Sequence, residues 1–146
     1  YVDYQNMFTF AGVMSQRRIF TATALELIKA GENEKAVEMI DKCLKVIPVE
    51  NFPLDMIIYG FNNEHDIISM IEAYYMAGAG AKASALCTKL ADSLLSSAEF
   101  FLDHYDYGKD SFDRCYKVLS YLAALAEEFG DSTLASSVIE RFNAML

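Results

Sequence analysis

The sequence predicts an all-α domain in which about three helical hairpins stack into a right-handed α-α superhelix. Three observations lead to this fold class. The 146 residues are 53% hydrophobic and include only two prolines, and their abundant Ala, Leu, Met and Glu residues favour helix over sheet. Apolar residues recur at helical spacing along most of the chain. A short pattern also repeats three times, in which a glycine that closes one apolar helix is followed five residues later by an alanine in the next.

The repeated pattern consists of Gly31 with Ala36, Gly78 with Ala83, and Gly130 with Ala135. Glycine at the C-terminal end of a helix adopts the left-handed conformation at little steric cost. The small alanine then lies where two antiparallel helices must approach closely. Each unit is therefore predicted to be a hairpin of two helices, and internal repeats of this kind are typical of helical solenoids.

We expect six helices, at about residues 15–30, 33–47, 63–77, 81–101, 111–129 and 132–146. They form hairpins over residues 15–48, 63–101 and 111–146 of a single domain that spans residues 1–146. Asn33 is placed to cap the second helix and Asp131 to cap the sixth. Asp110 and Asp113 have the spacing of a capping box in front of the fifth helix.

Three segments are predicted to lie outside these helices. Pro48 and Pro53 interrupt helix formation, which predicts a loop over residues 48–62. Residues 104–110 (HYDYGKD) are acidic and aromatic and contain glycine, so they are predicted to form a turn or loop. Residues 1–14 carry apolar side chains without clean periodicity, and we expect an ordered lead-in or a short helix that covers the first hairpin.

Charge excludes several classes of partner. The formal net charge is −9 and the pI is about 4.6, whereas a protein that binds nucleic acid needs a basic surface. An anionic membrane surface would repel the domain as well. No apolar run approaches the length of a membrane helix and no signal segment opens the chain. Because the first residue is Tyr1, we expect a piece of a longer protein.

The cysteines and histidines give no catalytic or metal-binding pattern. Cys43, Cys87 and Cys115 each lie inside an apolar helical pattern, so we expect buried thiols, with one incidental disulfide as the alternative. His65 and His104 do not lie in a metal-ligand spacing, and no glycine-rich phosphate loop or nucleophile motif occurs. No catalytic residue, metal or cofactor is therefore assigned.

An acidic cluster surrounds the predicted loop at residues 104–110. Its members are Glu99, Asp103, Asp106, Asp110 and Asp113, together with His104. Solvation of the loop and helix capping account for these residues, and oxygen ligation of a hard cation is the alternative. Phe100, Phe101 and Tyr105 at the same place are expected to pack internally, with a platform for a sugar ring as the alternative.

The first helix of each hairpin is predicted to line a concave groove where a partner binds. The candidate partner-binding residues are Arg18, Thr21, His65, Glu72, Tyr75, Met76, Lys117 and Glu127, and Leu25, Lys29, Ile68, Ser120 and Glu128 share the face. Arg, Tyr and Met are residue types that protein interfaces favour. Tyr74 and Tyr75 are adjacent and point to different faces, so Tyr74 is assigned to the core and Tyr75 to the groove.

The first unit resembles a tetratricopeptide repeat. Phe20 matches the bulky position of its first helix, Gly31 the turn, Ala36 the small position of its second helix, and Pro48 the closing proline. The second and third units lack the closing proline, and the units are further apart than the usual repeat of about 34 residues. We therefore expect extra loop and helix between them.

A second resemblance covers the chain as far as about residue 90. The stretches YVDYQNM, RRIF, LIKAGENEKAVEMIDKCLKVIP, NFPLD and IEAYYMAGAGAKA look like the C-terminal tail of large multi-pass membrane proteins of Bacteroidetes-type bacteria. The N-terminal part of those proteins is similar to protein O-mannosyltransferases. The residues that carry the match are Asn6, Met7, Arg17, Phe20, Leu27, Gly31, Ala36, Asp41, Pro48, Pro53, Ala73, Tyr74, Tyr75, Gly78 and Ala83. The resemblance implies a position beside the membrane, on the periplasmic face, and supplies no active-site residue here.

The sequence accordingly favours a non-catalytic interaction or scaffolding domain that forms the soluble tail of a membrane glycosyltransferase-like protein. Its partner would be a protein, a peptide or the membrane part of its own chain. One alternative is a structural or dimerisation tail with no separate ligand. Another is a carbohydrate-active helical domain that uses Glu99 or Asp103.

Overall fold

The structure is a computed structural model that describes residues 7–52, 54 and 63–146. These residues form six helices and no strand: α1 (Met7–Lys29), α2 (Asn33–Val46), α3 (Asn63–Met76), α4 (Gly80–Asp103), α5 (Tyr105–Glu128) and α6 (Ser132–Asn143). The predicted all-α helical-repeat fold is therefore confirmed.

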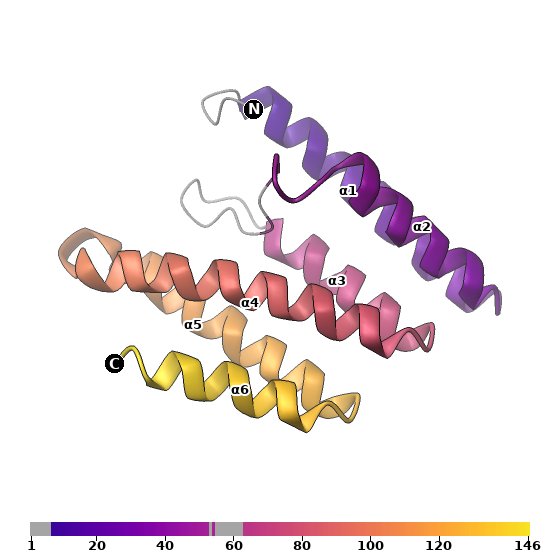
Figure 1. Ribbon diagram of the computed structural model, residues 1–146. Coiled ribbons are helices and arrows are strands. Elements are labelled where there is room, and N and C mark those ends of the chain that lie inside the picture. The colour runs from indigo at the N-terminus through magenta and orange to yellow at the C-terminus, as the bar shows by residue number, and fades with distance from the viewer. Residues whose placement is uncertain (1–6, 53, 55–62) are drawn as a thin grey trace.

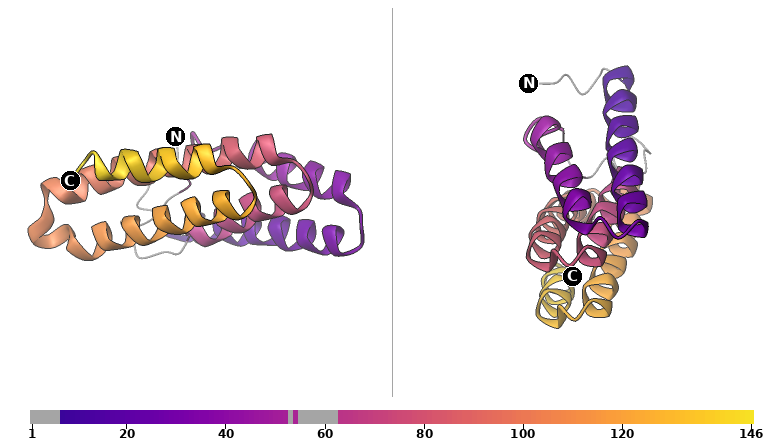
Figure 2. Two further views of the ribbon diagram at one scale, coloured as in Figure 1. Left: turned by 90° about the horizontal axis from the view of Figure 1, so that it is seen from below. Right: turned by 90° about the vertical axis from the view of Figure 1, so that its right-hand side faces the viewer.

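The helices pair as three antiparallel hairpins, α1 with α2, α3 with α4, and α5 with α6 (Figure 1). The hairpins stack one upon another, and the end-on view of Figure 2 shows that each contributes one helix to either side of the stack. We call α1, α3 and α5 the first layer and α2, α4 and α6 the second layer. The middle hairpin connects the other two, because α3 contacts α1 and α2 while α4 contacts α5 and α6.

The predicted glycine–alanine pattern forms the same turn in all three hairpins. Gly31, Gly78 and Gly130 have φ angles of 79°, 78° and 82°. The amide that follows each glycine donates to the carbonyl five residues before it, at 2.8–2.9 Å, and the glycine amide donates to the carbonyl three residues before it. This Schellman pattern satisfies carbonyls that the helix end leaves without partners. The alanines at the close approaches, Ala36, Ala83 and Ala135, are buried as predicted.

The turn also fixes which residue begins the next helix. Asp131 occupies the N-cap position of α6, and its carboxylate accepts a hydrogen bond from the amide of Leu134 at 3.3 Å, as predicted. The prediction that Asn33 caps α2 was wrong. The residue that directly follows the glycine takes the cap position, so Glu32 precedes α2 without a side-chain cap bond and Asn33 is already helical.

The predicted loop at residues 104–110 does not exist. Helix α4 ends at Asp103 and α5 begins at Tyr105, so only His104 separates them. The predicted capping box of Asp110 and Asp113 was therefore also wrong, because both residues lie inside α5. Gly108 is buried, and a Cβ atom on it would lie 2.9 Å from the carbonyl oxygen of Phe101. The glycine allows α4 and α5 to approach closely.

The N-terminal end also differs from the prediction. Residues 7–14 continue α1 as one 23-residue helix and do not form a separate lead-in; residues 1–6 lie outside the described residues. Pro48 does end α2 as predicted, and its carbonyl accepts the amides of Asn51 and Phe52 at 3.1 Å. The remainder of the predicted loop, residue 53 and residues 55–62, lies outside the described residues.

Side-chain hydrogen bonds join each hairpin to the next. Tyr74 belongs to the core, as predicted, and its hydroxyl donates to Asp41 of α2 at 2.7 Å. Lys82 at the start of α4 forms an ion pair with the same carboxylate at 2.5 Å. One hairpin further along, Ser84 of α4 donates to Asp131 at the start of α6, also at 2.5 Å. These contacts fix the glycine-turn ends of the three hairpins relative to one another.

Candidate functional site

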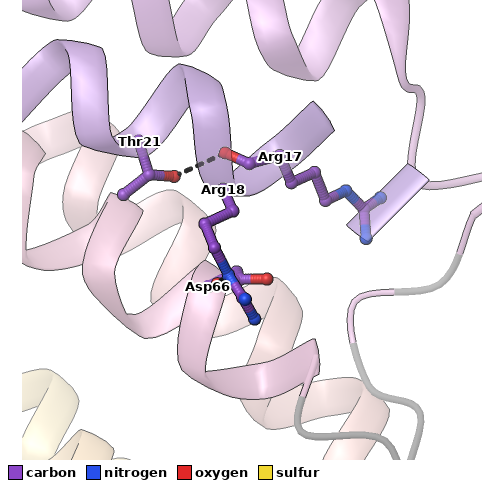
Figure 3. A network of polar contacts seen from close by, with 4 residues as sticks. All are labelled: Arg17, Arg18, Thr21 and Asp66. Carbon is purple, nitrogen blue, oxygen red and sulfur yellow. Dashed lines mark hydrogen bonds and ion pairs between the residues drawn. The ribbon is translucent and has the colours of Figure 1, made fainter. Parts of the chain in front are cut away.

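The residues predicted for the groove belong to α1, α3 and α5 of the first layer and differ in their exposure. Arg18 is exposed and its Nε lies 3.3 Å from Oδ1 of Asp66 on α3. Thr21 is only 4% exposed, and its hydroxyl donates to the carbonyl of Arg17 at 2.9 Å (Figure 3). Thr21 is therefore closed to a partner. The structure does not describe the side chain of His65.

The other predicted groove residues differ in how far they are available. Met76 is 46% exposed, and Lys117 and Glu127 are exposed as well. Glu127 accepts a hydrogen bond from Ser132 at 3.0 Å, across the turn that joins α5 to α6. Glu72 is half-buried. The first layer thus presents exposed charged and apolar side chains from three helices.

Tyr75 packs against Phe129, a contact that the sequence did not predict. Its ring stacks on Phe129 with centroids 4.8 Å apart and an interplanar angle of 6°. Its hydroxyl lies 3.4 Å from that of Ser84, and burial raises its pKa. A hollow of about 360 Å³ lies here, lined by Tyr75, Gly78, Gly80, Ser84, Phe129, Gly130 and Asp131. Because Ser84 and Asp131 already join α4 to α6, this polar group has a structural role.

Arg17 is a buried cation at the base of the first hairpin. Its guanidinium donates to the carbonyl of Phe52 at 2.6 Å, which ties the segment after α2 back to α1. Burial lowers the pKa of Arg17, and the nearby Cys43 and Asp66 act in the opposite direction. Asp66 is itself buried, and Figure 3 shows Arg18 beside it while the side chain of Arg17 extends away from it. These contacts give the cluster a structural role. The sequence alone could not predict this role, because an arginine on a helix is usually exposed.

Two hollows lie on the second layer, where the sequence predicted none. One, of about 340 Å³, is lined by Val49, Glu50, Leu54, Lys89, Asp92 and Ser93. The other, of about 410 Å³, is lined by Asp92, Leu95, Ser96, Glu99, Arg141, Ala144 and Met145. They share Asp92, whose carboxylate pairs with Arg141 of α6 at 2.7 Å. Of the eight residues predicted to bind a partner, only Tyr75 lines any of the three hollows.

Exposed aromatic rings gather where α4 turns into α5. Phe100 stacks on His104 with centroids 4.5 Å apart, and His104 lies 5.6 Å from Tyr107. Phe100 is 51% exposed and Tyr107 76%. We call Phe100, His104 and Tyr107 the aromatic end. This turn extends beyond the ends of the neighbouring helices in both Figure 1 and the left-hand view of Figure 2.

A second row of rings runs from the start of α5 to α6. Tyr105 meets Phe112 edge-on at 6.1 Å, and Phe112 contacts Phe142 of α6 at 5.7 Å. Phe101 is buried, which agrees with the expectation of internal packing. Phe100 and Tyr105 are half exposed, so packing does not account for all of their surface. The sequence analysis predicted a loop around Tyr107, whereas in the structure Tyr107 lies on α5, across the turn at His104 from Phe100 on α4.

The alternative of a cation site in the acidic cluster finds no geometric support. In residues 7–52, 54 and 63–146, no three acidic, histidine or cysteine side chains are grouped so as to hold a metal ion. The three cysteines are buried, as expected, and form no disulfide. Burial raises the pKa of Cys43 and of Cys87 to about 11. These thiols are therefore protonated at neutral pH and poorly reactive.

Comparison with known proteins gives no relative for this chain. No protein-family model, no curated protein and no solved structure matches it. Within the described residues, no helix combines the length and the apolar character that crossing a lipid bilayer requires.

Proposed function

We propose that this domain is a non-catalytic scaffold that binds a protein partner. The aromatic end is the observation that carries the proposal. Soluble domains seldom expose large rings side by side unless another surface covers them, and aromatic anchors supply much of the binding energy of protein interfaces. Phe100 and Tyr107 are exposed on either side of the turn between two helices, so a partner can reach both rings.

The repeat architecture supports the same proposal. The three turns share one hydrogen-bond pattern, and Asp41 and Asp131 connect successive hairpins. Such stacks present rigid, extended surfaces, which is how helical-repeat proteins bind their partners. We propose further that the domain is the soluble tail of a membrane glycosyltransferase-like protein and lies on the periplasmic side. That assignment depends on the sequence resemblance alone.

The alternative is a structural tail that braces or dimerises its parent protein. The two functions differ in which residues matter. Under the scaffold proposal, Phe100→Ala and Tyr107→Ala impair function while the domain stays folded. Under the structural alternative these changes are silent. Enlarging Ala36 or Ala83 to Leu in the tight hairpin contacts impairs function under both.

The test compares the intact parent protein with a version that lacks this domain and with a Tyr107→Ala version. The measurements are the activity of the parent and the mass of its complex in detergent. The scaffold proposal predicts that deletion and Tyr107→Ala both remove a component from the complex. If a tail-less parent keeps full activity and an unchanged complex, the proposal is wrong. If deletion matters and Tyr107→Ala does not, the structural alternative replaces it.

A further inference from the structure

We infer that the aromatic end binds a protein segment that carries arginine or lysine side chains. The inference rests on the proposed scaffold function and names the chemistry of the partner. Phe100, His104 and Tyr107 form a row of rings across the turn from α4 to α5, at centroid distances of 4.5 and 5.6 Å. The faces of such rings attract a guanidinium or ammonium group through their quadrupoles.

The hydrogen bonding of His104 suits a cationic donor. Its Nδ1 lies 2.8 Å from the carbonyl oxygen of Phe100. A carbonyl can only accept, so Nδ1 carries the hydrogen and Nε2 of the neutral ring is an acceptor. Arginine and lysine side chains carry only donors, so either can bond to Nε2 while it lies against the neighbouring rings.

Charge on the flanking residues points to the same partner. Residues 99–110 contain four carboxylates, on Glu99, Asp103, Asp106 and Asp110, against the single positive side chain of Lys109. All four acidic residues are exposed. Exposed carboxylates that flank the rings in the sequence favour a cation over a neutral or acidic partner, because the charges steer association and penalise the wrong sign.

The other occupants are less well matched. A second copy of this chain would bring a further net charge of −9 against the same carboxylates. A sugar ring also stacks on tyrosine and phenylalanine. However, a sugar site usually also places hydrogen-bonding groups around the ring, and Phe100, His104 and Tyr107 line none of the three hollows described above. A basic peptide segment can bind to exposed rings without such a hollow.

The test is a fluorescence-anisotropy titration of the intact domain at low salt. The probes are a labelled peptide of alternating arginine and glycine, its citrulline counterpart, its glutamate counterpart, and labelled maltotriose. We expect the arginine peptide to bind and the others not to. Tyr107→Ala and Phe100→Ala should each weaken binding about two- to fivefold, as the loss of one exposed cation–π contact implies. Tyr107→Phe, which keeps the ring, should bind like the wild type.

Two variants serve as matched controls. Tyr121→Ala removes a tyrosine that is 52% exposed elsewhere on α5, and Glu34→Gln removes an exposed carboxylate at the start of α2. Both should leave binding unchanged, while Asp103→Asn combined with Asp106→Asn should weaken it and reduce its salt dependence. Circular dichroism establishes that every variant is folded.

Each contrary outcome has a distinct meaning. Equal binding of the arginine and citrulline peptides overturns the cationic partner but leaves the scaffold function standing. No effect of Tyr107→Ala, with Glu34→Gln weakening binding as much as each aspartate change does, shows attraction to net charge only, which also overturns it. Binding of maltotriose that Tyr107→Ala abolishes replaces both proposals with a carbohydrate site. If no probe binds, the inference is wrong, and the deletion experiment on the parent decides the scaffold function separately.

Discussion

Gly31, Gly78 and Gly130 mark the turns within the three hairpins. Each has a positive φ angle, which side chains with a Cβ atom rarely adopt. The sequence could therefore predict all three turns from a glycine and a following alanine. Gly108 serves a purpose that the sequence could not predict. Its buried position against Phe101 is a property of packing between two helices, and a single sequence cannot distinguish that use of glycine from a turn.

Gly78→Ala tests the turn at its strained position. The left-handed conformation costs a residue with a Cβ atom about 1–2 kcal/mol, so we expect the free energy of unfolding in urea to fall by that amount. Gly80 is the matched control, because it also has open space around its Cα but lacks the positive φ. Gly80→Ala should leave stability unchanged or raise it slightly. A similar loss for both variants would contradict the account.

Gly108→Ala tests the close contact of α4 with α5. The added methyl group would lie within 3.2 Å of three atoms of Phe101, two of them in the backbone. Overpacking of this kind costs about 1–3 kcal/mol, measurable by thermal or urea unfolding. Gly12→Ala in α1 meets nothing within 4 Å and should stabilise the domain, because alanine favours helix more than glycine does. If the Gly108 variant were as stable as the wild type, α4 and α5 would have to lie further apart at this residue than the structure shows.

The buried thiols predict how stability depends on pH. Burial raises the pKa of Cys43 and Cys87 from 9.0 to about 11. Between these values the unfolded chain loses both protons while the folded domain keeps them, so the unfolded state gains. The contribution of these thiols to the free energy of unfolding should therefore be constant below about pH 9 and fall as pH rises towards about 11. Cys43→Ala should make the fall shallower; an identical slope in that variant would refute the assignment.

At the scale of the elements, periodicity identified all six helices but not the connection between α4 and α5. The segment HYDYGKD has the composition of a loop, yet its residues from Tyr105 onward are helical because Gly108 packs on Phe101 and Tyr105 on Phe112. Tertiary contacts outweighed local preference. For the same reason the aromatic end could not be predicted, because Phe100 and Tyr107 meet His104 only when α4 and α5 both extend to the turn.

The equivalent cap positions of two hairpins make a controlled pair of variants. Asp131→Ala removes the acceptor for the Leu134 amide and for Ser84. Loss of an N-cap costs about 0.5–2 kcal/mol, so we expect a destabilisation in that range by urea titration. Glu32→Ala changes the corresponding residue of α2, whose side chain makes no cap bond, and should have little effect. Equal effects would mean that the cap at Asp131 does not contribute.

At the scale of the whole molecule, the sequence predicted the stack of hairpins but not where its surface is open. The prediction assigned the partner to the first layer, using the register of tetratricopeptide repeats. In the structure Thr21 of that set is buried and Tyr75 is stacked on Phe129. The hollows along α4 and the aromatic end arise from how the hairpins pack together, and the periodicity of one helix contains no information about its neighbours.

The most direct test of the account is a map of amide chemical shifts for the isotope-labelled domain during titration with the arginine–glycine peptide. The account predicts that the largest changes fall within residues 99–110 and that Tyr107→Ala diminishes them. Changes centred on Arg18, Glu72 and Lys117 would contradict it and return the partner to the first layer. The absence of any localised change would show that the aromatic end does not bind a basic segment.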